Sequence, residues 1–410
     1  MMTKNQINER EQLEILTIEQ LVPANHLVRK LDAAIDFSFI YPLVENLYAQ
    51  FGRPSIDPVV LFKMAMIQYV FGIRSMRQTI KEIETNVAYR WFLGFGFHTE
   101  VPHFSTFGKN YVRRFENTDV FEQIFYRILK EIADEGLLSA DHIFIDSTHV
   151  KASANKRKFD KKMVRKETRA YEEKLQEELN IDREKNGKKP FPKEKFEKEE
   201  FKEIKESTTD PESGYYVKDE RTKQFAYSFH AATDERGFVL GAIVTPGNIH
   251  DSHILQPLVE KVIEKVKKPL AVAADAAYKT PAITNFLLEN QMLPVLPYTR
   301  PKTKDGFFRK HDYVYDEHND CYICPNDQTL PYVTTTKEGY RQFKSNPTIC
   351  ANCPFLKQCT ESKNHTKLIQ RHIWEAYVEE AEHLRHHEEI KLIYAKRKET
   401  IERVFADAKE

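Results

Sequence analysis

The sequence predicts a chain in two parts, an all-helical N-terminal region and an α/β domain whose mixed sheet is interrupted by a Cys-rich insertion. Three observations support this prediction. Short, separately capped helical segments fill residues 1–135, apolar runs typical of buried strands begin near residue 140, and all five cysteines lie beyond residue 320. We therefore expect a helical domain at 1–135, an α/β domain at 136–299 and 366–410, and the insertion at 300–365.

The composition excludes several classes of protein. The 410 residues carry 62 Lys and Arg against 62 Asp and Glu, so the chain is not globally basic, although charge can still be concentrated locally. No apolar run approaches the roughly 20 residues of a transmembrane helix, and no Gly-rich phosphate-binding loop is present. The stretch Met1–Glu11 is polar, unlike a signal peptide, so we expect a cytoplasmic protein.

The helices of the N-terminal region are predicted from residues that can cap them. A Thr-x-x-Gln capping box occupies Thr17–Gln20, and Pro58 stands at the first position of a helix that ends at Gly72. The candidate N-caps in chain order are Thr17, Asp57, Ser75, Asn86 and Ser105.

Basic side chains recur on the polar side of these short helices. They are Arg74, Arg77, Lys81, Arg90, Lys109, Arg113 and Arg114. Such a series suits a helix-turn-helix domain, in which one helix enters a DNA groove and basic residues contact phosphates. A helical bundle with a solvated basic face gives the same pattern. For double-stranded DNA we expect contacts from Arg74, Arg77, Lys81, Arg113 and Arg114.

The period of the apolar residues changes in the second part. His142–Asp146 is a short apolar run ending in an acid, which predicts a buried strand. The highly charged segment 151–206 then interrupts the domain, and we expect it to form an inserted helical hairpin. Further strands are expected at 224–231, 237–245, 270–274 and 293–296, with a helix capped by Asp251 among them, and the chain is expected to end in one helix from Tyr394 to Glu410.

Two aspartates close apolar runs. A carboxylate at the end of a buried strand projects from a rigid sheet edge, so Asp146 and Asp275 can converge and hold Mg²⁺. Two such ions about 3.5–4 Å apart activate a water and stabilise the leaving oxygen of a phosphodiester. A third acid is needed to complete such a site, and the C-terminal helix offers Glu399 and Glu402, about one turn apart. Each aspartate alone can instead cap a turn.

Weaker candidates flank this set. His250 and Asp251 lie in a turn between a strand and a helix, where Asp251 is explained as a helix cap.

The cysteines form two Cys-x2-Cys pairs and a single residue. Cys321 and Cys324 are separated by 25 residues from Cys350 and Cys353, and Cys359 lies beyond. This spacing is typical of tetrahedral zinc sites, so we expect a structural zinc ribbon held by the two pairs. Cys359 can replace one ligand, and free thiols are the alternative.

Three ordered motifs resemble those of DDE transposases from bacterial insertion sequences of the IS4-like superfamily. The first is IDSTHVKASANK at Ile145–Lys156, and the second is AADAAYKT at Ala273–Thr280. The segment Thr245–Asp251 is similar to a strand-to-helix turn of the same family, and the resemblance covers nearly the whole chain. The third motif consists of Tyr394, Arg397, Glu402 and Lys409.

The resemblance implies an RNase H-like catalytic fold and a transposase that cleaves and transfers DNA strands with two Mg²⁺ or Mn²⁺ ions. It assigns the metal triad to Asp146, Asp275 and Glu402. It assigns DNA-backbone contacts to Tyr394, Arg397 and Lys409. The implied partners are terminal inverted repeats and target DNA, bound by a homodimer at the nucleoid.

Two features depart from the family pattern. Ala277 stands where the second motif often carries Gly, and the sequence ends eight residues after Glu402, where relatives continue, as in a truncated copy. Two other functions fit the same residues. One is an inactive transposase that only binds DNA, and the other is a different RNase H-like nuclease, such as a Holliday-junction resolvase.

Overall fold

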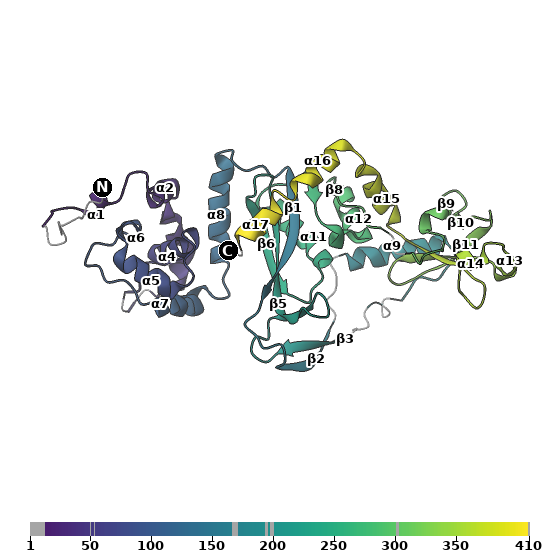
Figure 1. The fold of residues 1–410 in the computed structure, drawn as a ribbon, viewed down its shortest axis with the longest axis horizontal. Helices are drawn as coiled ribbons and strands as arrows, with labels where there is room; N and C mark the ends of the chain where they lie inside the picture. Colours follow the sequence, from purple (N-terminus) through teal and green to yellow (C-terminus); the bar gives the residue numbers. More distant parts are fainter. Residues whose placement is uncertain are drawn as a thin grey trace, which may run out of the picture. The chain divides into compact units, whose positions relative to one another are not determined.

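The computed structural model describes residues 13–408 except 50, 53, 166–170, 193–195, 197–200, 301 and 302. The chain forms two compact units, Met1–Glu135 and Gly136–Lys409 (Figure 1). Nowhere in the described part of the chain is a helix both long enough and apolar enough to cross a membrane.

The regular secondary structure in the described residues of the N-terminal unit is entirely helical. They are α1 (Ile18–Leu21), α2 (Leu27–Ala34), η1 (Phe37–Phe39), α3 (Ile40–Val44), η2 (Glu45–Leu47), α4 (Pro58–Val70), α5 (Met76–Thr85), α6 (Val87–Phe92), α7 (Phe104–Asn110), η3 (Tyr111–Phe115) and α8 (Val120–Asp134). Leu61, Met64 and Ile67 of α4 lie in the core, together with Ile83 of α5 and Phe92 of α6.

Most of the predicted caps of this unit are confirmed. The side chains of Thr17, Asp57, Ser75 and Asn86 each accept a hydrogen bond from a backbone N–H in the first turn of the following helix. The expected cap at Ser105 is wrong, because His103 caps α7 and its Nδ1 accepts from the Ser105 N–H at 3.3 Å. An imidazole nitrogen thus replaces the hydroxyl oxygen as acceptor.

The second unit contains two sheets and several helices. The first sheet region comprises β1 (His142–Lys151), β2 (Phe159–Arg165), α9 (Glu172–Lys185), β3 (Phe201–Ser207), β4 (Gly214–Val217), β5 (Lys223–Thr233), β6 (Val239–Pro246), η4 (Asp251–His253), α11 (Leu255–Lys265), β7 (Ala271–Ala273), η5 (Ala276–Tyr278), α12 (Pro281–Glu289) and β8 (Leu293–Val295). The strand order is β2-β3-β4-β5-β1-β7-β8, and β6 also pairs with β5. Strands β5 and β6 run antiparallel to their neighbours, whereas β7 and β8 run parallel to β1.

The alternation of side chains along β1 gives the sheet two apolar faces. Ile143 and Ile145 pack with α11 and α12, whereas Phe144 packs with the C-terminal helices. Asp146 has the same parity as Phe144, so it belongs to the face that the C-terminal helices cover. This parity positions the candidate site.

The segment 151–206 differs from the helical hairpin that we expected. Strands β2 and β3 pair antiparallel in the first sheet, and α9 lies between them in the sequence. Cross-strand ion pairs join Lys162 to Glu206 and Lys161 to Glu203 at 2.8 and 2.9 Å. Opposite charges facing each other across strands stabilise a polar ribbon that carries no apolar signal.

A second sheet carries the cysteines and has the order β13-β12-β11-β10-β9. Its region comprises η6 (Lys310–Asp312), β9 (Val314–Asp316), β10 (Cys321–Ile323), β11 (Thr329–Thr335), β12 (Tyr340–Lys344), α13 (Pro347–Ala351), α14 (Leu356–Cys359) and β13 (Leu368–His372). Tyr322, Leu330, Phe343 and Ile369 form the core of this sheet.

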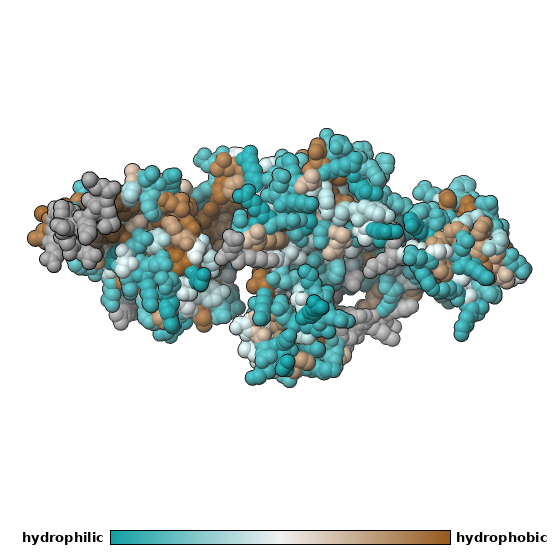
Figure 2. Space-filling view, in the orientation of Figure 1, coloured by the Kyte–Doolittle hydropathy of each residue, from teal (hydrophilic) through white to brown (hydrophobic). Residues whose placement is uncertain are grey.

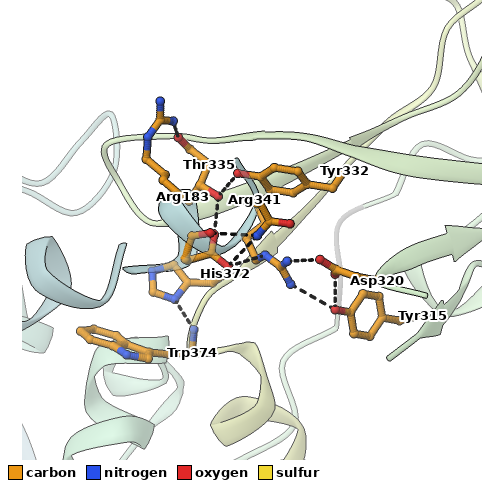
Figure 3. A network of polar contacts seen from close by, with 10 residues as sticks. Arg183, Tyr315, Asp320, Tyr332, Thr335, Arg341, His372 and Trp374 are labelled. Carbon is orange, nitrogen blue, oxygen red and sulfur yellow. Dashed lines mark hydrogen bonds and ion pairs between the residues drawn. The ribbon is translucent and has the colours of Figure 1, made fainter. Parts of the chain in front are cut away.

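Helix α9 docks onto this second sheet through polar contacts. The Thr335 hydroxyl donates to Asp182 at 2.6 Å, and the Arg341 guanidinium lies 3.1 Å from the same carboxylate. Figure 3 shows Arg341 also reaching Asp320, and Arg183 of α9 donating to the Thr335 carbonyl. The contacts explain why a segment inserted between two strands of one sheet folds against the other.

The C-terminal segment forms three helices, α15 (Glu375–Leu384), α16 (Glu388–Lys396) and α17 (Ile401–Asp407). The expected single helix from Tyr394 is therefore wrong, since the chain turns between Lys396 and Ile401. The buried side chains of Ile393, Ile401 and Phe405 all pack against the sheet, which requires the turn between them. Hydrophilic side chains cover much of the visible surface of this unit (Figure 2).

Candidate functional site

Three acidic residues from distant parts of the sequence meet on the face of the sheet covered by α16 and α17. Asp146 lies on β1, just beyond the residues that pair with β7, Asp275 follows β7, and Glu402 lies in the first turn of α17. Burial raises the pKa of Asp146 to about 6, and the charges of Asp275 and Glu402 act in the same direction. Asp146 is therefore within electrostatic reach of both other acids.

The position of Asp146 differs from the expected strand end. Strand β1 continues to Lys151, because β5 pairs with it along Phe144–Lys151. Pairing with β7 stops at Phe144, so Asp146 still lies where one neighbouring strand has ended. Because β7 stops pairing at Phe144, the Asp146 carboxylate is placed as it would be at the end of a strand.

Arg397 joins two of the acids. Its Nη2 lies 2.5 Å from Asp146 Oδ2 and its Nη1 lies 3.4 Å from Glu402 Oε1. The side chains of Arg397 and Asp146 are only 11% and 17% exposed, against 48% for Glu402. The guanidinium is the main influence that lowers the pKa of Asp146 against the effect of burial. It supplies positive charge where the three carboxylates meet.

The remaining residues of the third motif have different surroundings. Tyr394 is half-buried and packs against the core that contains Phe144 and Phe405. Glu399 is exposed in the turn before α17, and the ion pair with Arg397 goes to Glu402 instead. Lys409 lies outside the described residues.

Asp275 has a local role as well. Its Oδ1 accepts a hydrogen bond from the Ala277 N–H at 2.9 Å, so it caps the short helix η5. Asp275 is therefore a helix cap and a candidate metal ligand at the same time.

Two further groups belong to this site. Tyr278 is buried, and its pKa is raised by burial first and then by Asp251, Asp146 and Asp275. Its hydroxyl makes no hydrogen bond of good geometry among the described atoms, although a side-chain contact with Ser147 lowers its pKa somewhat. Apart from its place in the second motif, Tyr278 carries no physical signal that sequence reasoning could have used.

The surroundings of Asp251 also differ from expectation. His250 is the N-cap of η4, because its Nδ1 accepts from the Ser252 N–H, and Asp251 is the first residue of that turn. Asp251 Oδ1 lies 3.8 Å from Nδ1 of the buried His230, and its charge acts on Tyr278. Asp251 is thus a fourth carboxylate near the acids.

The donor chemistry fits a hard divalent cation, since carboxylate oxygens are the ligands that Mg²⁺ prefers. Within the described ranges, however, no group of three or more His, Cys, Asp or Glu side chains is arranged to hold a metal ion. Arg397 instead donates to one oxygen of Asp146 and one of Glu402, and so offsets part of the negative charge of the acids.

The cysteines surround a separate cavity of about 30 Å³ in the second sheet region. Four of the five line it, namely Cys324, Cys350, Cys353 and Cys359. Cys321 is buried on β10, and its pKa is raised first by burial and then by the charges of Asp316 and Asp320. The expected two-pair ligand set is thus not the set that shares this cavity.

The basic residues of the N-terminal unit fall into two groups. Arg90 is buried and donates to the carbonyls of Gly96, Phe97 and Thr99, so it holds a loop in place. Arg114 is half-buried, 4.4 Å from the ring of Tyr48. The exposed group consists of Arg74, Arg77, Lys81, Lys109 and Arg113.

Comparisons with known proteins give two matches. Residues 16–113 match the family model of a transposase domain (DUF772), and residues 323–410 match that of a transposase DDE domain. No curated protein and no solved structure matches the chain significantly. The second match contains Glu402, Arg397 and the four cysteines of the cavity. Together the two family matches indicate a DDE transposase.

Proposed function

We propose that this protein binds the ends of an insertion sequence and catalyses Mg²⁺- or Mn²⁺-dependent DNA cleavage and strand transfer. The observation that carries the proposal is the meeting of Asp146, Asp275 and Glu402 on one face of the sheet. The negative charges of Asp275 and Glu402 beside the mostly buried Asp146 favour a cation at this place, and Arg397 offsets only part of that charge.

The sheet supports the choice of catalytic fold. Three antiparallel strands, β6, β5 and β1, continue into two parallel strands, β7 and β8, with helices α11 and α12 in the connections. This mixed strand order agrees with the RNase H-like fold that the sequence motifs imply. We propose that fold for residues 136–299 together with the C-terminal helices.

Asp146, Asp275 and Glu402 would hold the divalent ions, which supply an activated water and stabilise the leaving oxygen of the phosphodiester. The chain's own contribution is positional. Asp146 and Asp275 are fixed by the strands β1 and β7, whereas Glu402 depends on the packing of Ile401 and Phe405.

Arg397 has two successive roles in this proposal. It neutralises Asp146 and Glu402 while the acids carry no metal. When it leaves these acids, its planar guanidinium suits bidentate contact with a DNA phosphate. Tyr394 and Lys409 are proposed to contact the backbone beside it.

The test of catalysis is nicking of a labelled fragment that carries the element's end, in Mg²⁺. Asp146→Asn, Asp275→Asn and Glu402→Gln should each abolish nicking, because each removes an anionic ligand and nearly preserves its shape. Glu399→Gln is the matched control and should remain active, since its side chain is exposed in the turn. Nicking that survives loss of Asp146 or Asp275 would overturn the mechanism.

DNA binding is proposed for the N-terminal unit and is tested separately. Arg74→Ala, Arg77→Ala or Lys81→Ala should weaken binding by full-length protein and reduce its salt dependence by about one ion for each phosphate that is no longer neutralised. Lys30→Ala, an exposed Lys on α2, is the control. Binding without any nicking by the wild-type chain would favour the inactive, DNA-binding form.

A further inference from the structure

The ribbon formed by β2 and β3 extends beyond the rest of the first sheet. Strand β2 forms the edge of that sheet, and β3 is held to β4 by the pairing of Glu206 with Gly214. Figure 1 shows both strands beyond the end of β5. Because a two-stranded ribbon is marginally stable by itself in water, a partner would stabilise it.

The ribbon has little apolar burial of its own. Among the described residues of β2 no side chain is buried, and Met163 is 60% exposed. On the described part of β3 the buried side chain is that of Ser207, which is polar. The surface over these strands is mostly hydrophilic (Figure 2). The hydrophobic effect therefore contributes little to holding the ribbon in place.

Basic side chains outnumber acidic ones on the ribbon and in the turn before it. The basic side chains of the described residues 155–164 and 203–207 are Lys156, Arg157, Lys158, Lys161, Lys162 and Lys205. The acidic ones are Asp160, Glu203 and Glu206, and the two glutamates form the cross-strand ion pairs with Lys161 and Lys162. The remaining positive charge suits a polyanion.

Two of these lysines stand directly opposite each other. Lys161 of β2 is paired with Lys205 of β3, and like charges at such positions destabilise a strand pair. The ammonium group of Lys205 lies 4.6 Å from the ring centre of Phe159 and 4.3 Å from that of Tyr215. Side chains alternate along a strand, so Phe159, Lys161 and Lys205 share one face. An anion bound at this face would relieve the repulsion between the two lysines.

The base of the ribbon is packed against the turn that leads to the acid cluster. Gly214 is paired with Ala226 of β5, and a Cβ atom at Gly214 would lie 2.6 Å from the Gly247 nitrogen. The Gly247 N–H donates to the Ala226 carbonyl at 2.8 Å. The same turn continues to Asp251, the fourth carboxylate near the acids. The ribbon and the acids therefore belong to one packed framework.

The register of the sheet gives the separation between the acids and the ribbon. One row across β1, β5, β4, β3 and β2 contains Lys151, Ala226, Gly214, Glu206 and Asp160. The row spans about 19 Å, and the segment from Asp146 to Lys151 adds about 17 Å along β1. At right angles these lengths give about 25 Å, which is the length of about seven base pairs of B-DNA.

We propose that the ribbon of β2 and β3 binds the backbone of the DNA duplex that is cleaved at the acids, about seven base pairs from the reacting phosphodiester. The inference rests on the proposed function and adds a second DNA-binding surface to that of the N-terminal unit. The major groove of B-DNA admits a two-stranded ribbon, and lysine ammonium groups bind phosphates as point charges. The ribbon therefore has both the shape and the charge for this contact.

The experiment uses the full chain and a labelled fragment that carries the element's end. Binding is measured at several salt concentrations, and the contacts are mapped by hydroxyl-radical footprinting. Arg157→Ala/Lys158→Ala and Lys161→Ala/Lys205→Ala should each lower the slope of log K against log salt by about two, because two phosphates are no longer neutralised. Protection about seven base pairs from the nick should be lost, while the rest of the footprint remains.

Two further double variants serve as controls. Lys161→Arg/Lys205→Arg keeps both charges and should keep the footprint of the wild-type chain. Lys357→Ala/Lys363→Ala removes the same amount of charge from two exposed lysines of the second sheet region and should bind DNA like wild type.

The possible failures of this inference differ from failure of the proposed function. Wild-type binding and an unchanged footprint in the ribbon variants would overturn the ribbon contact alone. Equal losses in the Lys357→Ala/Lys363→Ala control would assign the effect to overall charge and so contradict the proposal. An intact footprint with loss of strand transfer would assign the ribbon to target DNA instead. A wild-type chain that binds no element end overturns the proposed function as well.

Discussion

The acid cluster and the cysteine cavity both gather side chains of the types that can ligate metals, but the charged groups around them differ. Asp146 and Glu402 hold a permanent cation, Arg397, between them. The cavity thiols can stay neutral by keeping their protons, and burial favours this for Cys359. A metal must therefore displace an arginine at the first site, whereas it displaces protons at the second. Because of this difference, we expect the two regions to respond differently when their stability is measured.

The largest effect is expected from replacing Arg397, because this removes the positive charge beside the acids. In Arg397→Gln the Asp146 carboxylate remains partly buried without its cation, and loss of one partner of a buried ion pair costs about 3–5 kcal/mol. Added Mn²⁺ should restore more stability to this variant than to wild type, because no guanidinium has to leave first. Thermal unfolding with and without Mn²⁺ measures both effects.

Two variants act as controls for this prediction. Arg397→Lys keeps a positive charge and should fall between wild type and Arg397→Gln. Arg403→Gln removes an exposed arginine of α17 and should behave like wild type. Equal Mn²⁺-induced shifts in wild type and Arg397→Gln would show that the arginine does not compete with the ion.

Local sequence signals predicted much of the fold. The caps at Asp57 and Asn86 and the strands around Gly237 were found because each signal lies within a few residues. The ribbon of β2 and β3 was missed, since it depends on pairing between charged segments about 40 residues apart in the chain. The turn at Arg397 was missed as well, because no Gly or Pro marks it.

The residues of the candidate site were predicted from local motifs, whereas the contacts between them depend on long-range packing. The motifs pointed to Asp146, Asp275 and Glu402, and in the structure Asp146 lies within electrostatic reach of the other two. The ion pair between Asp146 and Arg397 was not predictable, because it depends on the packing of α16 and α17 against the sheet. The choice between Cys321 and Cys359 stayed open because spacing alone does not reveal which cysteines line a common cavity.

The second expected effect is an opposite response of the two regions to pH. Burial raises the pKa of Asp146 to about 6 and lowers that of His372, in the second sheet, to about 4. The stabilisation linked to Asp146 is present below its ordinary pKa of 3.8 and is lost as pH rises through about 6. That linked to His372 is present above 6.5 and is lost as pH falls towards 4, with an upper limit of about 3 kcal/mol.

Trp374 reports on the second sheet, because its ring lies 5.4 Å from that of His372. In a Trp91→Phe background, Trp374 fluorescence during urea unfolding should show the sheet weakening from pH 6.5 to 4. His372→Gln should lower stability at neutral pH and flatten this dependence. His318→Gln, at an exposed position, should keep the wild-type slope. An unchanged slope in His372→Gln would assign the pH response to another group.

The smallest expected effect compares one buried tyrosine in each region. The Tyr278 hydroxyl at the acid cluster has only a weak contact with Ser147 and no hydrogen bond of good geometry among the described atoms, whereas the Tyr313 hydroxyl lies 3.2 Å from Cys359 Sγ at the cavity. Removing an unsatisfied buried hydroxyl is neutral or stabilising, while removing a satisfied one costs about 1 kcal/mol. Urea unfolding of the metal-free chain should therefore rank Tyr278→Phe at or above wild type and Tyr313→Phe below it. The reverse order would mean that the Tyr278 hydroxyl is already bonded within the acid cluster, and that charge there is balanced by more than Arg397.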